Sequence, residues 1–113
     1  MKLAEQHCRA LGKETPPLAG PELGALHAQI EPAWRIHSGP LLVRSFESKQ
    51  YPLLVALTGR IGALAQAEDH HPDMQLGYGK LEVSLSTHSV GGLSMNDFVL
   101  AARIDQLARE SSF

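Results

Sequence analysis

The spacing of apolar residues along the chain alternates between a helical and a strand period, and it divides the chain into elements. Leu23, Leu26 and Ile30 recur on one face of a helix that begins at Gly20-Pro21-Glu22. Proline suits the first helical position, and a glutamate in the first turn complements the helix dipole. Pro32 ends this predicted helix, because a proline forces the residue before it out of the helical conformation.

Strand spacing follows between Trp34 and Phe46. Apolar and polar residues alternate on both sides of Ser38-Gly39-Pro40, and a glycine next to a proline favours a turn. The segment therefore predicts two antiparallel strands joined as a β-hairpin.

A second, longer helix is predicted from Ser48, which can cap its first turn, to about Glu68. The positions that follow the helical period in this segment are Tyr51, Leu54, Val55, Thr58, Ile61, Leu64 and Ala65. Gly59 and Gly62 inside it weaken the helix by roughly 1 kcal/mol each relative to alanine, or they let another backbone approach closely. Pro72 stops this helix.

Strand alternation returns from Gln75 to His88, and a Gly-Tyr-Gly string within it predicts a bend that divides the segment into two strands. His88 is expected to close the second strand. Gly91-Gly92 then forms a loop. The string Ser94-Met95-Asn96-Asp97 resembles a capping box, which predicts the start of a last helix.

The predicted order is helix, two strands, helix, two strands, helix. Two antiparallel hairpins with helices between and after them predict a single sheet that helices cover on one face. Residues 1–19 contain Gly12, Pro16 and Pro17 and few large apolar residues, so they are predicted to be a partly ordered lead-in. Residues 20–113 are predicted to form one domain, whose uncovered sheet edge or face favours oligomerisation.

Length and composition limit the functions open to this chain. Its 113 residues suffice for one domain with a small core. No apolar run is longer than the five residues of Leu53–Leu57, whereas a membrane helix needs about 18. Ten Lys and Arg residues against 12 Asp and Glu residues give no basic surface for nucleic acid, and no secretory signal is visible. Cys8 is alone, which excludes an intramolecular disulfide and a cysteine-rich zinc site.

Histidine is the unusual component of the composition, because the chain has six and two of them are adjacent. His70, His71, His88 and Asp97 all fall at predicted ends of elements, where binding groups usually lie. Each also has a purely structural interpretation. The helix dipole favours histidines after a helix, and His88 can be an ordinary polar residue at a strand end. Asp97 can simply cap the helix that begins after Ser94.

Three kinds of chemistry compete for these four residues. A metal site has suitable ligand types, but the chain has no His-x3-His pair on a helix face, and adjacent side chains do not face one point. A nucleophilic site is disfavoured, because there is no Gly-x-Ser-x-Gly elbow and Cys8 lies in the lead-in. Proton transfer remains, because a histidine with a pKa of about 6.5 serves as an acid or a base at neutral pH.

The histidines, one aromatic residue and the acid also stand at fixed spacings. His70-His71-Pro72 is followed after five residues by Tyr78, after nine more by His88 and after eight more by Asp97. This pattern resembles the signature of the pterin-4a-carbinolamine dehydratases, also called 4a-hydroxytetrahydrobiopterin dehydratases. The resemblance extends over residues 34–107.

The resemblance implies an α+β fold in which three helices cover one face of a four-stranded antiparallel sheet, in the order α-β-β-α-β-β-α. It implies loss of water from a 4a-hydroxytetrahydropterin, which gives the quinonoid dihydropterin and recycles the cofactor of aromatic amino acid hydroxylases. No metal or organic cofactor is required, and family members are homodimers or homotetramers. Such an enzyme is expected in the cytoplasm, without direct contact with nucleic acid or a membrane.

The resemblance also implies roles for individual residues. His70, His71 and His88 would surround the pterin as general acid and base, and Asp97 would orient or polarise a histidine. The substrate-binding residues that it implies are Pro72, Tyr78, Ser86 and Thr87. A tyrosine in a strand is also typical of ordinary packing, so Tyr78 has a second interpretation.

Two positions depart from the family's pattern. Many members carry a charged residue where this chain has Gln66, and an aromatic residue where it has Met74. Glu68, two residues after Gln66, is a candidate substitute for the missing charge. These departures keep a second function open, that of a non-enzymatic scaffold or assembly factor, for example in Rubisco assembly in carboxysomes. Retention of all four polar residues argues against the scaffold.

Overall fold

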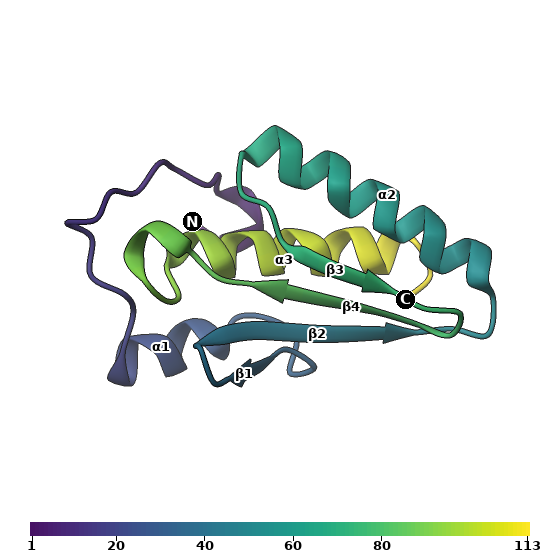
Figure 1. Ribbon diagram of the computed structural model, residues 1–113, viewed down its shortest axis with the longest axis horizontal. Coiled ribbons are helices and arrows are strands. Elements are labelled where there is room, and N and C mark those ends of the chain that lie inside the picture. Colours follow the sequence, from purple (N-terminus) through teal and green to yellow (C-terminus); the bar gives the residue numbers. More distant parts are fainter.

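The structure is a computed structural model that describes all 113 residues. Its helices and strands follow the predicted order (Figure 1). In chain order the elements are η1 (Leu3–Glu5), α1 (Gly20–His27), β1 (Arg35–His37), β2 (Leu41–Glu47), α2 (Tyr51–Glu68), β3 (Asp73–Leu76), β4 (Lys80–Leu85), η2 (His88–Val90) and α3 (Met95–Glu110). The prediction of an α+β fold with three helices and a four-stranded antiparallel sheet is confirmed. No helix combines the length and the apolar character that a membrane crossing requires.

The sheet has the strand order β1-β2-β4-β3, and every neighbouring pair is antiparallel. Leu42 pairs with Leu85 and Phe46 pairs with Leu81, and all four side chains are buried. Successive side chains of a strand point to opposite faces, so these residues share the face that α2 and α3 cover (Figure 1). The opposite face carries exposed polar residues such as Ser45.

One buried cluster joins the helices to the covered face of the sheet. It contains Leu26 from α1, Ile61 from α2 and Phe98 from α3. Burial of apolar surface in this cluster supplies the main favourable contribution to folding. All three helices therefore belong to the same core.

A buried polar network crosses this core. Arg44 in β2 faces α3, where its guanidinium lies 2.5 Å from the Asp105 carboxylate. Trp34 Nε1 donates to the same carboxylate (2.7 Å), and so does the Glu31 amide (3.1 Å). Burial raises the pKa of Asp105, and these hydrogen bonds and the charge of Arg44 act in the opposite direction. The network fixes α3 against β2 and against the segment after α1.

The first helix is shorter than the apolar spacing predicts. It ends at His27 rather than continuing through Ile30, because the amides of Gln29 and Ile30 bond to carbonyls three residues back and tighten the chain into turns. His27 Nε2 also donates to the Trp34 carbonyl (2.6 Å), which draws the chain toward β1. Ile30 is buried all the same, so its apolar character reflects the core and not the helix.

Ser48 does not cap α2, in contrast to the prediction. The N-cap is Gln50, and the Ser48 hydroxyl accepts a hydrogen bond from the Gln50 amide (3.0 Å) in a turn before the helix. This local hydrogen bond competes with the helix for the serine side chain.

The last two strands also have different ends from those predicted. β3 begins at Asp73, directly after Pro72, and β4 ends at Leu85. His88 does not close β4, because Thr87 pairs with Gly92 across a tight turn and His88 opens the short 3-10 helix η2 inside that turn.

Residues 1–19, which the sequence predicts as a partly ordered lead-in, lie against the rest of the chain in the structure. Leu3 in η1 is buried within the core cluster, and η1 contacts α3. The Leu18 amide donates to the Leu93 carbonyl (2.8 Å). Between Leu3 and Leu18, the chain contacts the end of α2 through Glu68 and the start of α3 through Asn96.

Candidate active site

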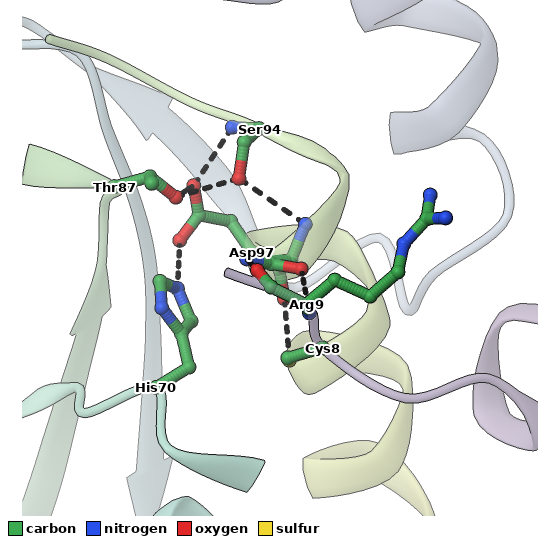
Figure 2. A network of polar contacts seen from close by, with 7 residues as sticks. Cys8, Arg9, His70, Thr87, Ser94 and Asp97 are labelled. Carbon is green, nitrogen blue, oxygen red and sulfur yellow. Dashed lines mark hydrogen bonds and ion pairs between the residues drawn. The ribbon is translucent and has the colours of Figure 1, made fainter. Parts of the chain in front are cut away.

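The end of α2 determines where His70 lies. Asp69 adopts the left-handed backbone conformation (φ 52°). Its amide bonds to the Gln66 carbonyl (3.3 Å), and the His70 amide bonds to the Ala65 carbonyl (3.2 Å). These two bonds form a Schellman motif, which satisfies the last carbonyls of the helix and turns the chain away from its axis. His70 is therefore the first side chain after the turn, and it points toward α3 (Figure 2).

The register of the sheet brings this segment beside the end of β4. Asp73 pairs with Ser84 in the antiparallel ladder. Continuing this register by three residues places His70 opposite Thr87. The start of β3 and the end of β4 therefore meet at one end of the sheet.

Asp97 lies in the first turn of α3 and its side chain is completely buried. Its Oδ2 accepts hydrogen bonds from the Ser94 amide (2.9 Å) and the Thr87 hydroxyl (2.8 Å). Its Oδ1 accepts one from His70 Nε2 (2.7 Å), as Figure 2 shows. The bond with Ser94 completes the predicted capping box. Asp97 therefore caps α3 and also contacts His70.

This hydrogen bond decides which ring nitrogen of His70 carries a hydrogen. A carboxylate only accepts, so Nε2 donates, and the neutral ring keeps its free lone pair on Nδ1. The His70 side chain is 12% exposed and that of Asp97 is 0% exposed, so the bond is shielded from water. A hydrogen bond in such a surrounding is electrostatically stronger than one in water. His70 is thus held in one tautomer and can exchange a proton at Nδ1.

His71 has a different partner. Its side chain is exposed, and its Nε2 donates to Gln66 Oε1 (3.1 Å). The uncharged Gln66 therefore contacts a site histidine although it departs from the family's pattern. Glu68 does not take over this role, because its carboxylate binds the amide of Cys8 in the N-terminal segment.

His88 lies in η2 and is exposed. A cavity of about 290 Å³ lies beside it and is lined by Gly39, Pro40, Leu41, Ser86, Thr87, His88, Gly91 and Gly92. Three of the predicted site residues share this cavity, which His70 and His71 do not line. Thr87 connects the two parts of the site, because its hydroxyl binds Asp97 while the residue lines the cavity.

Tyr78 does not lie with the histidines. It sits in the turn between β3 and β4, at the opposite end of this hairpin from His70. It is 83% exposed, and its ring stacks on Tyr51 with 5.9 Å between the ring centroids. Pro72, by contrast, stays at the site because it directly precedes β3. Within one chain, Tyr78 is therefore too far along the hairpin to contact what His70 contacts.

Met74, the second departure from the family's pattern, faces the helices. It pairs with Val83 and packs against the core cluster. The substitution therefore affects the packing of β3 under α2.

The remaining reactive groups are few. No three His, Cys, Asp or Glu side chains are grouped so that they could hold a metal ion. Cys8 is half-buried, and burial together with the carboxylates of Glu68 and Asp97 raises the pKa of its thiol to about 11. It is therefore a neutral thiol at physiological pH. The arrangement of His70, Asp97 and Thr87 is suited to holding and moving a proton.

Comparison with known proteins finds related sequences over nearly the whole chain. The sequence profile of the family described as pterin 4 alpha carbinolamine dehydratase matches residues 16–107. A relative from Alkaliphilus metalliredigens is 39% identical over 108 residues. That protein is named a pterin-4-alpha-carbinolamine dehydratase on a provisional basis. The match covers 96% of this chain and 97% of that protein.

Two solved structures share the fold. One is a transcriptional coactivator/pterin dehydratase from Brucella melitensis, with a TM-score of 0.76 and 25% identity over 81% of this chain and 98% of that one. The other is a pterin dehydratase-like protein identified as a RuBisCO assembly factor in the alpha-carboxysome, with a TM-score of 0.59 and 24% identity over 67% of this chain and 89% of that one. The family match and the relatives together show that this chain belongs to the pterin-4-alpha-carbinolamine dehydratase family.

Proposed function

We propose that this protein dehydrates 4a-hydroxytetrahydropterins by general acid–base catalysis. The observation that carries the proposal is the hydrogen bond from His70 to the buried Asp97, at the end of the sheet where Thr87 and His88 line a cavity. A carboxylate that orients an imidazole is a recurrent device for proton transfer. Membership of the dehydratase family supports the same reaction.

The reaction needs two proton transfers. The C4a–O bond breaks, and because hydroxide is a poor leaving group the departing oxygen must receive a proton and leave as water. The proton on ring N5 must be removed, and the electron pair of the N–H bond forms the N5=C4a double bond of the quinonoid dihydropterin. Imidazoles can do both near neutral pH. The substrate would come from an aromatic amino acid hydroxylase.

His70, His71 and His88 are the groups proposed for these transfers. Asp97 occupies Nε2 of His70, so His70 would exchange its proton through Nδ1. Gln66 occupies Nε2 of His71 in the same way. The remaining substrate contacts would come from Pro72, Ser86 and Thr87.

A stopped-flow assay with a 4a-hydroxytetrahydropterin tests the proposal. Micromolar protein is expected to accelerate dehydration, and His71→Ala or His88→Ala is expected to lower the rate about 100-fold or more, the scale of a lost acid or base. His37→Ala, at an exposed position of β1, is the matched control. Absence of any acceleration by the wild-type protein would contradict the proposal, and a variant with wild-type turnover would remove its residue from the mechanism.

A non-enzymatic assembly factor is the second candidate, and the uncharged Gln66 is the observation that favours it. The alternative predicts that the protein captures a specific large partner and lacks dehydratase activity. Full dehydratase activity without such a partner would end it. The buried His70–Asp97 pair supports the enzyme, because an assembly surface does not need a shielded histidine.

We also propose that the chain is a subunit of a homodimer or homotetramer. β1 and β3 are the edge strands of the sheet, and edge strands are usually covered or paired in native assemblies. Apart from Met1, the large apolar side chains that remain exposed are Ile36, Tyr51, Val55, Leu76 and Tyr78. Size-exclusion chromatography with light scattering is expected to give two or four times the chain mass, and a single 12.3 kDa species would contradict this.

A further inference from the structure

Glu68 lies near the end of α2, two residues before His70, and its side chain binds the N-terminal segment. Its Oε1 accepts a hydrogen bond from the Cys8 amide (2.8 Å), and its Oε2 accepts one from His7 Nδ1 (2.8 Å). Arg103 in α3 forms an ion pair with the same carboxylate (2.8 Å). The Glu68 side chain is only 6% exposed. Glu68 therefore joins three parts of the chain at one point.

Asn96 in α3 binds Arg9, the residue that follows Cys8 in the N-terminal segment. The Arg9 amide donates to Asn96 Oδ1 (2.9 Å), and Asn96 Nδ2 donates back to the Arg9 carbonyl (2.6 Å). Asn96 is buried, and it directly precedes Asp97 in the first turn of α3. Figure 2 shows Cys8 and Arg9 beside this turn. Both polar groups of the asparagine side chain therefore bind the backbone of one residue, Arg9.

We propose that Glu68 and Asn96 are positioning residues, which bind consecutive residues of the N-terminal segment and so fix the end of α2 relative to the start of α3. His70 follows the first of these elements and Asp97 begins the second, so the segment sets the separation of the pair. A hydrogen bond of this kind weakens steeply when its geometry is disturbed, and a misplacement of about 1 Å can cost about 100-fold in rate. The inference rests on the proposed role of the His70–Asp97 pair in dehydration.

Variants at Asn96 test the inference most directly. Asn96→Leu keeps the number and branching of the side-chain heavy atoms and removes both hydrogen bonds to Arg9. Asn96→Gln keeps an amide that can accept from the Arg9 amide and donate to the Arg9 carbonyl, and it serves as the conservative variant. Glu68→Gln keeps the shape of the side chain and an acceptor for the Cys8 amide while it removes the charge that binds Arg103.

Arg60→Ala is the matched control. Arg60 also joins α2 to α3, through Ser111 and Glu110, but it does so at the other end of α3. Loss of this contact tests whether any weakening of the contact between the two helices has the same effect.

Two readouts separate positioning from a general loss of stability. The first is the pair of constants kcat and KM, and the second is the ring ¹H–¹⁵N NMR signal of His70 Nε2, which reports the hydrogen bond to Asp97. Asn96→Leu is expected to lower kcat about tenfold with little change in KM, and to shift or broaden the NMR signal. Asn96→Gln is expected to recover part of both, and Arg60→Ala to leave both unchanged.

A folded Asn96→Leu protein with wild-type kcat and an unchanged His70 signal would overturn the inference. An equal loss in Arg60→Ala would overturn it too, because the effect would then be general. If Asn96→Leu does not fold, Glu68→Gln decides by the same readouts. The NMR signal needs no substrate. An inactive wild-type protein would therefore contradict only the proposed function, and the NMR signals of the variants would still test whether Asn96 and Glu68 position the His70–Asp97 pair.

Discussion

At the scale of single residues, the surroundings of Asp97 make the three site histidines unequal. The Ser94 amide and the Thr87 hydroxyl hold one carboxylate oxygen and leave the other for His70. The ring of His70 therefore has one orientation and one tautomer. His71 and His88 are exposed and have no carboxylate partner, so their rings can adjust to a bound molecule.

His70→Gln tests the role of the fixed ring. The glutamine amide can still donate to Asp97, which avoids leaving a buried carboxylate without a partner, but it has no nitrogen that titrates near neutral pH. Dehydration is expected to slow about 100-fold while the melting temperature stays close to that of the wild type. His37→Gln in β1 is the control, and a wild-type rate in His70→Gln would exclude this residue from proton transfer.

Cys8 is expected to react slowly with alkylating reagents. Its pKa is raised from its usual value near 9 to about 11, which lowers the thiolate fraction at pH 8 about 100-fold, and the thiolate is the reactive species. Iodoacetamide at pH 8 should therefore modify the folded protein at least about 100 times more slowly than the protein in urea. Because the chain has one cysteine, mass spectrometry gives the rate directly, and equal rates would contradict the burial of the thiol.

At the scale of elements, Glu68 links the pH dependence of stability to the contact between α2, α3 and the N-terminal segment. Burial alone would raise its pKa, but the hydrogen bonds from His7 and the Cys8 amide and the charge of Arg103 outweigh burial and lower the pKa below its usual value near 4.5. A lowered pKa means that the folded state holds the proton less tightly than the unfolded chain. The resulting stabilisation is fully present above pH 4.5 and is lost as the pH falls through the folded pKa.

Glu68→Gln should therefore be less stable than the wild type at pH 7, and the difference should shrink as the pH falls below about 4.5. Urea unfolding at pH 7, 5, 4 and 3.5 measures the free energy of unfolding of both proteins. Glu110→Gln, an exposed carboxylate paired with Arg60, is the control and should show a smaller effect. A difference that grows toward low pH would contradict the lowered pKa of Glu68.

At the scale of the whole molecule, the Arg44–Asp105 pair connects the sheet to α3 across the core. Removing one partner of a buried ion pair leaves the other charge uncompensated and typically costs about 3–5 kcal/mol. Asp105→Ala would also remove the acceptor of Trp34 Nε1 and of the Glu31 amide.

We therefore expect Asp105→Ala to lower the free energy of unfolding by about 3–5 kcal/mol in urea denaturation. Glu110→Ala, which breaks an exposed ion pair on the same helix, should cost less than about 1 kcal/mol. Similar losses of unfolding free energy in the two variants would show that the buried network stabilises the fold no more than an exposed ion pair does.

The order and type of the elements could be predicted because they depend on neighbours along the chain. The capping box at Ser94 and Asp97 was visible in the string itself. The predicted ends of α1 and β4 were wrong, because His27 bonds to Trp34 and Thr87 pairs with Gly92. Such contacts replace the local preference for a longer helix or strand.

The grouping of the candidate residues could be predicted only in part. The spacing of His70, His88 and Asp97 indicated residues that the fold gathers at one end of the sheet. The same spacing also included Tyr78, which the length of β3 carries to the far end of the hairpin. Spacing along a chain gives the distance between residues only when the elements between them are known.

By itself, then, the sequence determined the α+β order of elements, the hairpin turns, the cap of α3 and the residue types suited to proton transfer, because periodicity, proline, glycine and capping act over a few residues. Only the tertiary structure decided that His70 donates to Asp97, that Glu68 binds the Cys8 amide and that Asn96 binds Arg9. These partners are 27, 60 and 87 residues apart. No local preference specifies such pairs, since they form only when the sheet register and the packing of α2 on α3 bring them within hydrogen-bond distance.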